Sequence, residues 1–416
     1  MCSLAVAVIG RPNLRSFPAE VWIISVATFL IRSVGFLALY STVFYTSIGL
    51  SASALSLALF AAGFAGVLGS LAGGWSATRF GSTDVLIAGA VLNVPLLFAL
   101  ALTSTNPASA IVLASFSVAV TQSFAGPAAA LVTGSSYRGD TVTVVAFHRI
   151  FLSSGVTVAP IAVALVGEDN FSLLFALSSL GSLSTAALLL RERPRLRAAE
   201  QRAAARKGTV SPQEFDAYSP VNPVDSSTRT ARLWAIVVVF GIAMTVYAQS
   251  MSGTPLSVAR LSDGAQLYSV LLIVNSLFII AFELPLSFVV AKLRWNYALG
   301  FGISVTGVGL AVCGAGTSWA VCIFGFALFS LGEAIFIPSS SASIAKLSAS
   351  SDNPRYQGYL SAAQSIGFAV GPGIGAFGVL HDSALYWALV VQISLAAGVV
   401  AIAAGMNKDR SPDHVG

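Results

Sequence analysis

Charge and metal-binding residue types are scarce in this chain of 416 residues. Only 9% of the residues are charged, against roughly 25% in an ordinary soluble domain, and there are three cysteines and three histidines. The sequence contains no Cys-x-x-Cys, His-Glu-x-x-His or Gly-x-x-x-x-Gly-Lys-[Ser/Thr] motif. We therefore expect no metal site, no cofactor and no enzyme, and an ATP-driven pump or a membrane enzyme is disfavoured.

Apolar sequence is abundant instead. Hydrophobic residues make up 56% of the chain, and the mean hydropathy is +0.83. The apolar runs are about 20 residues long, enough for a helix to cross a hydrocarbon core of about 30 Å, whereas a barrel would show short alternating segments. The sequence predicts an all-α integral membrane protein, and its high alanine and glycine content suggests a bacterial cytoplasmic membrane.

The apolar runs predict twelve spans, six on each side of one polar stretch. The predicted spans are residues 20–45, 51–77, 84–103, 107–134, 141–166, 171–190, 233–252, 265–291, 296–315, 318–346, 356–380 and 384–406.

The polar stretch 191–232 divides the chain. It holds nine of the 22 lysines and arginines and four prolines. We expect a six-helix bundle over 1–190, a cytoplasmic basic connector over 191–232 and a second six-helix bundle over 233–416. Residues 191–207 have helix-forming character and 211–230 read as a disordered tether. A regulatory role for the connector and a plain linker remain alternatives.

The distribution of positive charge predicts the orientation. With twelve spans, 19 of the 22 lysines and arginines fall on one side, which the positive-inside rule makes cytoplasmic. Both termini then lie on that side. The net charge of +5 is explained by topology, so we expect no nucleic-acid partner.

Two landmarks recur in both halves at offsets of 211 and 212 residues. In each, a polar residue or a glycine precedes a proline by five positions. A parallel repeat of this kind indicates two similar bundles, and we expect the glycines and prolines to bend their helices, although both residues are common in membrane helices. The landmarks are Gln122 with Pro127, Glu333 with Pro338, Gly155 with Pro160, and Gly367 with Pro372.

The turn after the second predicted span resembles a signature of the major facilitator superfamily. That signature, Gly-x-x-x-Asp-Arg-x-Gly-Arg-Arg, is matched by Gly74, Arg79 and Gly81. Thr78 stands where the family has aspartate, and the two positions after Gly81 are not basic. The resemblance implies a gating loop, here without part of its charged latch.

The fifth predicted span is similar to the Gly-x-x-x-Gly-Pro-x-x-Gly-Gly signature of the drug:proton antiporter branch. Pro160 is retained and several glycines are replaced, whereas the eleventh span keeps more of the glycines. The resemblance to the superfamily covers the whole chain and implies two six-helix bundles related by a pseudo-two-fold axis. The resemblance to the antiporter branch implies proton-coupled efflux of a lipophilic small molecule, and we expect a monomer.

Four charged residues lie inside predicted spans, where each costs about 2.5–3.5 kcal/mol near the bilayer centre. Arg32 and Arg149 lie in the first half, and Glu283 and Glu333 in the second. Glu333 is the first candidate for a proton carrier, since a carboxylate in a half-dry cavity can exchange protons. Its alternative role is a structural carboxylate paired with an arginine.

The other three charges have open alternatives. Glu283 lies two residues before Pro285 and is either a second coupling group or a partner for backbone groups freed by that proline. Arg32 either binds an anionic group of the substrate or tunes a carboxylate, or it is a fixed ion-pair partner. Arg149 either faces inward or extends towards the cytoplasmic surface, and its neighbour His148 either relays protons or packs.

Uncharged polar residues in the spans are candidates for the wall of a substrate cavity. Each could instead form an interhelical hydrogen bond. The candidates are Gln122, Asn275, Tyr247, Gln249 and Gln364.

The leading hypothesis is a secondary transporter that exchanges a lipophilic small molecule for protons. The alternative is a transporter of an organic anion or sugar, with Arg32 and Arg149 binding the substrate. A receptor or scaffold without transport is a third possibility, but it leaves four embedded charges without a role. The expected partners are the substrate, protons and the lipid bilayer.

Overall fold

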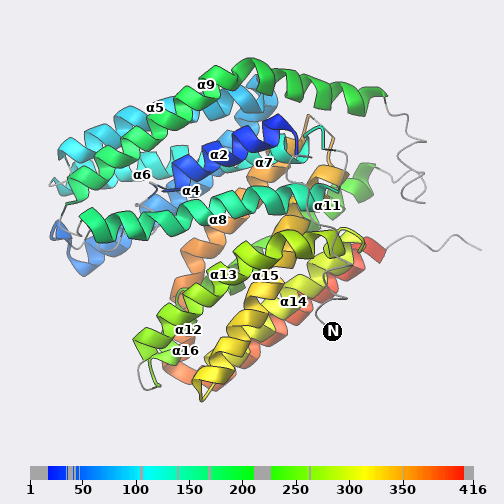
Figure 1. Cartoon of the computed structure of the whole chain (residues 1–416). Helices are drawn as coiled ribbons and strands as arrows, with labels where there is room; N and C mark the ends of the chain where they lie inside the picture. The colour runs from blue at the N-terminus through cyan, green and yellow to red at the C-terminus, as the bar shows by residue number, and fades with distance from the viewer. Residues whose placement is uncertain are drawn as a thin grey trace, which may run out of the picture.

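The computed structural model describes most of the chain and shows helices throughout the described part (Figure 1). The predicted all-α fold class is confirmed. The described residues are 17–33, 35, 41, 44–45, 47–103, 106–137, 140–166, 170–209, 226–261, 264–349 and 351–406. Most of the predicted tether, residues 211–230, lies outside them.

The helices before the connector are here called the N-terminal helices. Residues 107–133 form two consecutive helices that are separated at Phe124, because Pro127 has no N–H with which to continue the backbone hydrogen bonds. The N-terminal helices are α2 (Ala19–Ser33), α4 (Ala52–Phe80), α5 (Ser82–Thr103), α6 (Pro107–Ser123), α7 (Ala125–Thr133), α8 (Thr141–Val166) and α9 (Phe171–Thr209).

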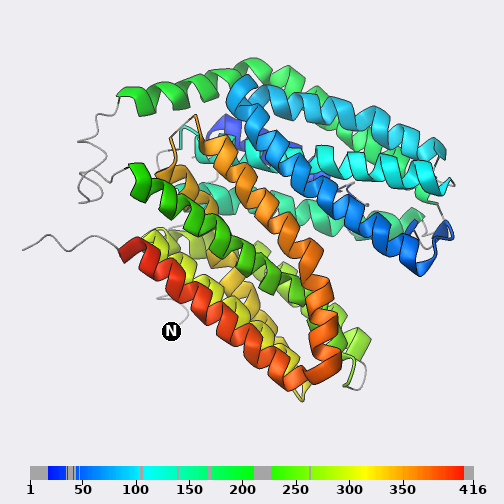
Figure 2. The ribbon, with the colours of Figure 1, turned by 180° about the vertical axis from the view of Figure 1, so that it is seen from behind.

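The helices after the connector are the C-terminal helices. The last one turns back on itself at Asp382, whose backbone is not helical, and the side chain of Asp382 caps the returning segment by accepting a hydrogen bond from the Leu385 N–H (Figure 2). The C-terminal helices are α11 (Ser226–Tyr247), η2 (Ala248–Ser250), α12 (Gly253–Val258), α13 (Gly264–Val290), α14 (Trp295–Gly314), α15 (Trp319–Leu347) and α16 (Asn353–Met406).

Nine helices in the described part of the chain are long and apolar enough to cross a membrane. Some predicted spans are counted together, since α16 alone covers the predicted ranges 356–380 and 384–406. The chain is a multi-pass membrane protein, and the predicted number of twelve spans stays a prediction.

The helix expected over residues 191–207 of the polar stretch is present. Helix α9 continues without a break from the predicted sixth span through residues 191–207 to Thr209, and α11 begins at Ser226. We call the end of the molecule at which Thr209 and Ser226 lie the connector side (Figure 1).

The two groups of helices meet along two seams. On one, α8 packs against α13 and α15, and on the other α16 packs against α4 and α7. The ribbons of the two groups converge towards the connector side and diverge away from it (Figures 1 and 2).

The seam between α16 and the N-terminal helices is closed by backbone contact and hydrogen bonds. A Cβ atom on Gly126 would lie 2.9 Å from the Cα atom of Gly358, so these helices approach without side chains between them. Nearby, the hydroxyl oxygens of Ser70 and Ser361 are 3.0 Å apart, and Asn353 donates to the Thr133 hydroxyl at 3.0 Å. These contacts hold the two groups together on the connector side.

Candidate functional site

Three of the four embedded charges form one cluster between the two groups of helices. The Arg149 guanidinium on α8 lies with Nη1 3.0 Å from Glu283 Oε1 on α13 and with Nη2 2.8 Å from Glu333 Oε1 on α15. The exposed fractions of these side chains are 10%, 0% and 6%. Arg149, Glu283 and Glu333 are called the charge cluster below. It links the N-terminal and C-terminal helices through buried ion pairs.

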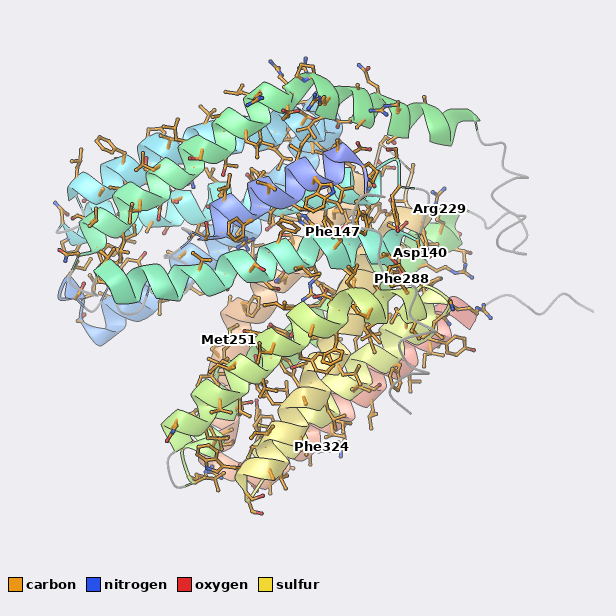
Figure 3. The ribbon with its side chains drawn as sticks, in the orientation of Figure 1. Asp140, Phe147, Arg229, Met251, Phe288 and Phe324 are labelled. Atoms are coloured by element: carbon orange, nitrogen blue, oxygen red, sulfur yellow. The ribbon has the colours of Figure 1, made fainter. Side chains whose placement is uncertain are left out.

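Apolar side chains close in sequence to the charge cluster pack together. Phe147, two residues before Arg149, is buried between α2 and α8, and Phe288 packs against the same apolar cluster from α13 (Figure 3). At the connector-side end of α8, Asp140 forms an ion pair with Lys346 of α15, with 3.2 Å between Asp140 Oδ2 and Lys346 Nζ. Helix α8 is therefore fixed to the C-terminal helices at two levels.

Glu333 has the larger set of hydrogen-bond donors. Besides the hydrogen bond from Arg149, its Oε2 atom accepts one from the Asn275 amide at 2.9 Å, and its Oε1 atom accepts one from the Tyr247 hydroxyl at 3.4 Å. The same Asn275 amide donates to Ser330 at 3.0 Å, one turn before Glu333 on α15. Both oxygens of Glu333 are thus bonded, as a buried carboxylate requires.

Glu283 has fewer partners than Glu333. Its Oε1 atom is close to Arg149 but is not aligned for a hydrogen bond, and its Oε2 atom has no hydrogen-bond partner in the described part of the chain. Since no backbone N–H in that part bonds to the carboxylate, the alternative role next to Pro285 has no contact to support it.

Arg149 uses its guanidinium within the membrane-spanning part and not at the surface. Its Nη1 atom also lies 3.4 Å from the carbonyl oxygen of Glu333. The alternative in which Arg149 extends to the surface does not match this geometry.

Arg32 lies apart from the charge cluster. It is half-buried on α2, close to Gly155 of α8, where an added Cβ would lie 2.9 Å from the Arg32 Cβ. Among the described residues Arg32 forms no ion pair, so the fixed-partner alternative is not observed there. His148 is buried and its Nδ1 atom lies 3.2 Å from the Ser25 hydroxyl, which is a packing role.

The remaining cavity candidates lie on the seam or within the C-terminal helices. Gln122 donates to Ser365 of α16 at 2.9 Å, across the closed seam. Gln249 is 2% exposed; it donates to the carbonyl of Gly371 and accepts from Tyr386 at 2.5 Å, and is thus an interhelical packing residue. Gln364 is half-buried on α16. Of the five candidates, Asn275 and Tyr247 contact the charge cluster.

The residues of the resembled gating loop lie at the junction of α4 and α5. Gly74 is in the seam, Thr78 and Arg79 are exposed, and the Arg79 guanidinium lies 5.2 Å from the centre of the Trp75 ring. Gly81 has φ +90°, which favours glycine, and it alone separates the two helices.

Sequence reasoning missed the residues that hold this junction. Glu200 of α9 accepts hydrogen bonds from the Ser82 N–H at 2.6 Å and the Thr83 hydroxyl at 3.0 Å, so it caps the N-terminus of α5. Asp84 pairs with Arg193 at 2.9 Å and Arg197 at 2.5 Å. The spacing of Arg193, Arg197 and Glu200 along one helical face was the available signal.

The glycines and prolines expected to bend helices act in different ways. Pro127 separates α6 from α7, as described above, whereas Pro338 and Pro372 lie inside continuous helices. Gly155 and Gly367 are packing positions, where an added Cβ would lie 2.8 Å from backbone atoms of α2 and α11 respectively. The side chain of Pro160 lies outside the described residues.

The chemistry available at the site is electrostatic. One cation faces two carboxylates across the boundary between the helix groups, and no group of three metal-ligating side chains occurs among the described residues. Such a cluster can bind or release a proton, and it can exchange partners when the two groups move.

Comparisons with known proteins agree with this architecture. A family model described as Major Facilitator Superfamily matches residues 21–294 and 239–415. A stretch of 84 residues is 32% identical to Multidrug resistance protein 1 of Bacillus subtilis (strain 168), and it spans 20% of this chain and 22% of that protein.

Solved structures resemble most of the chain. The human organic anion transporter MFSD10 aligns with a TM-score of 0.69 and 14% identity, over 92% of this chain and 100% of that one. The proton:xylose symporter XylE aligns with a TM-score of 0.62 and 14% identity, over 92% and 93%. At these identities the likeness concerns the fold.

Proposed function

Since the chain belongs to the major facilitator superfamily, we propose that it is a secondary active transporter that exports a lipophilic small molecule in exchange for protons. The two bundles, 1–190 and 233–416, would rock about a central site, with 191–232 joining them. The protein would act as a monomer in a bacterial cytoplasmic membrane, with the connector and both termini on the cytoplasmic side.

The observation that carries the proposal is the charge cluster. Two carboxylates share one guanidinium, so the cluster holds one excess negative charge when all three groups are ionised. An uncompensated charge is costly in the membrane interior, and protonation of one carboxyl removes it. Because Arg149 belongs to one bundle and the carboxylates to the other, protonation also changes the attraction between the bundles.

The state of the seams supports alternating access. The two groups of helices are joined on the connector side by Gly126, Gly358 and the hydrogen bonds beside them. In the proposed cycle this is the form closed towards the cytoplasm, and the reverse form requires these contacts to break. The partial relative named for multidrug resistance supports a lipophilic substrate.

The direct test is efflux of a fluorescent lipophilic cation from energised cells. Cells carry the wild type, the double variant Glu283→Gln/Glu333→Gln or an empty vector, each with and without a protonophore. We expect efflux from the wild type alone, and its loss on adding the protonophore. Wild-type efflux that persists with the protonophore would contradict proton coupling.

A second candidate is transport of an organic anion, because Arg32 has no counter-ion among the described residues. A half-buried arginine without a carboxylate partner is suited to an anionic group of a substrate. The same cells then receive a fluorescent lipophilic anion. Anion efflux by the wild type, lost in Arg32→Gln, would favour this candidate; cation efflux alone would exclude it.

A further inference from the structure

Glu283 and Glu333 lie against the same guanidinium but differ in how well their ionised forms are satisfied. Glu333 has a donor on each oxygen, from Arg149, Asn275 and Tyr247. Glu283 is fully buried, has one unaligned contact with Arg149, and has an Oε2 atom without a hydrogen-bond partner among the described residues. The two carboxyl groups are therefore not equivalent.

We propose that Glu283 carries the transported proton, and that Glu333 stays ionised as the permanent partner of Arg149. This assignment rests on the proposed function and reverses the expectation from sequence, which put Glu333 first. It concerns one step only: a proton binds to the carboxylate of Glu283, and the same proton leaves it later in the cycle.

Charge balance favours one bound proton in the charge cluster. Among the described residues, the charged groups that face Glu283 are Arg149 from α8 and Glu333 from α15. With one proton bound, Arg149 and the remaining carboxylate form a neutral pair. Without it, a second negative charge stays buried with no cation of its own.

The hydrogen-bond donors around each carboxyl group decide which of the two takes that proton. Hydrogen-bond donors stabilise the ionised form of a carboxyl group, and burial without donors disfavours it. Donors converge on Glu333, whereas the described residues supply no aligned hydrogen bond to Glu283. Protonation of Glu283 thus relieves the more poorly satisfied carboxylate and leaves the bonds to Glu333 intact.

The assignment also supplies a coupling mechanism. When Glu283 is ionised, α8 is attached electrostatically to both α13 and α15 through Arg149. When Glu283 is protonated, the attachment to α13 weakens and that to α15 remains. A proton on Glu283 therefore changes the contact between α8 and α13, at the boundary between the two bundles.

Infrared spectroscopy of the purified full chain in lipid nanodiscs tests the assignment without substrate. The carbonyl stretch of a protonated carboxyl group is recorded at neutral pH for the wild type, Glu283→Gln and Glu333→Gln. Glu20→Gln is the matched control, because Glu20 is a buried glutamate that accepts two hydrogen bonds from Ser136. We expect the band to be lost in Glu283→Gln and kept in the other two variants.

The opposite pattern, with the band lost in Glu333→Gln and kept in Glu283→Gln, would overturn the assignment. A wild type with no such band at neutral pH would also overturn it. Because the measurement needs no transport, failure of the efflux assay would refute the proposed function and leave the band assignment standing.

The temperature of thermal unfolding gives a second test of the assignment, which also applies if one variant folds poorly. Glutamine resembles a protonated glutamate, so Glu283→Gln should unfold near the wild-type temperature, whereas Glu333→Gln should unfold at a lower one. A larger loss of stability in Glu283→Gln than in Glu333→Gln would contradict the assignment.

Discussion

Gly74 of α4 and Gly358 of α16 meet backbone to backbone. A Cβ atom on Gly74 would lie 2.9 Å from the Gly358 Cα, and one on Gly358 would lie 2.8 Å from the Gly74 Cα. Distances below 3.0 Å between such atoms require the helices to separate. The glycine of the resembled gating loop therefore acts here through close packing, beside an exposed Thr78 in place of the family's aspartate.

The first prediction follows from this contact. Gly358→Ala should push α4 and α16 apart on the connector side and shift the protein away from the closed form, because the obstructing atoms are backbone. Spin labels at the exposed positions Thr78→Cys and Ser351→Cys, in a Cys2→Ser background, would report a longer distance.

Gly373→Ala is the matched control on the same helix, since a Cβ there meets nothing within 4 Å. It should leave the distance distribution unchanged. An equal shift in both variants, or none in Gly358→Ala, would show that the glycine contact does not govern closure.

The second prediction concerns the two described cysteines. Cys313 and Cys322 are both 0% exposed, in the apolar packing of the C-terminal helices. A charged maleimide should therefore not react with either thiol in the folded protein and should react with both after unfolding. Mass spectrometry of the Cys2→Ser variant checks this, and rapid labelling before unfolding would mean that these helices open.

The third prediction concerns the cap of α5. Glu200→Ala removes the acceptor for Ser82 and Thr83, and loss of such a cap costs about 1 kcal/mol. Faster deuterium exchange is expected at the start of α5 and in residues 191–209 of α9. Glu192→Ala is the control, because the ion pairs of Glu192 with Arg191 and Arg195 stay within α9. Equal exchange in the two variants would argue against a role for the cap.

The fold class and the embedded charges could be predicted from the sequence for the same reason. An apolar run of about 20 residues has few structural solutions, and a charge within it is conspicuous because it is costly. Arg149, Glu283 and Glu333 were all identified in this way. Their grouping could not be predicted, since it depends on how α8 packs against α13 and α15, over separations of more than 100 residues.

Arg32 and Glu200 show where local patterns give too little information. Arg32 carries the same local signal as Arg149 but lies outside the charge cluster, because its helix packs on α8 from the side of Gly155. Glu200 lies in a polar stretch that hydropathy marks as connector. The helix-forming residues there extend α9 to Thr209, which brings Glu200 to the start of α5.

The last prediction separates charge balance from transport. Arg149→Gln leaves Glu283 and Glu333 buried without a cation, and breaking a buried ion pair costs roughly 3–5 kcal/mol. This variant should unfold at a clearly lower temperature than the wild type and should not transport.

The triple variant Arg149→Gln/Glu283→Gln/Glu333→Gln has no charge at the same positions, and replacement of a whole buried ion cluster is often neutral for stability. It should therefore recover most of the thermal stability without recovering proton-driven efflux. Thermal unfolding and efflux measured on the same preparations check both halves. A triple variant as unstable as Arg149→Gln would mean that specific hydrogen bonds, and not charge balance, hold the bundles together at this site.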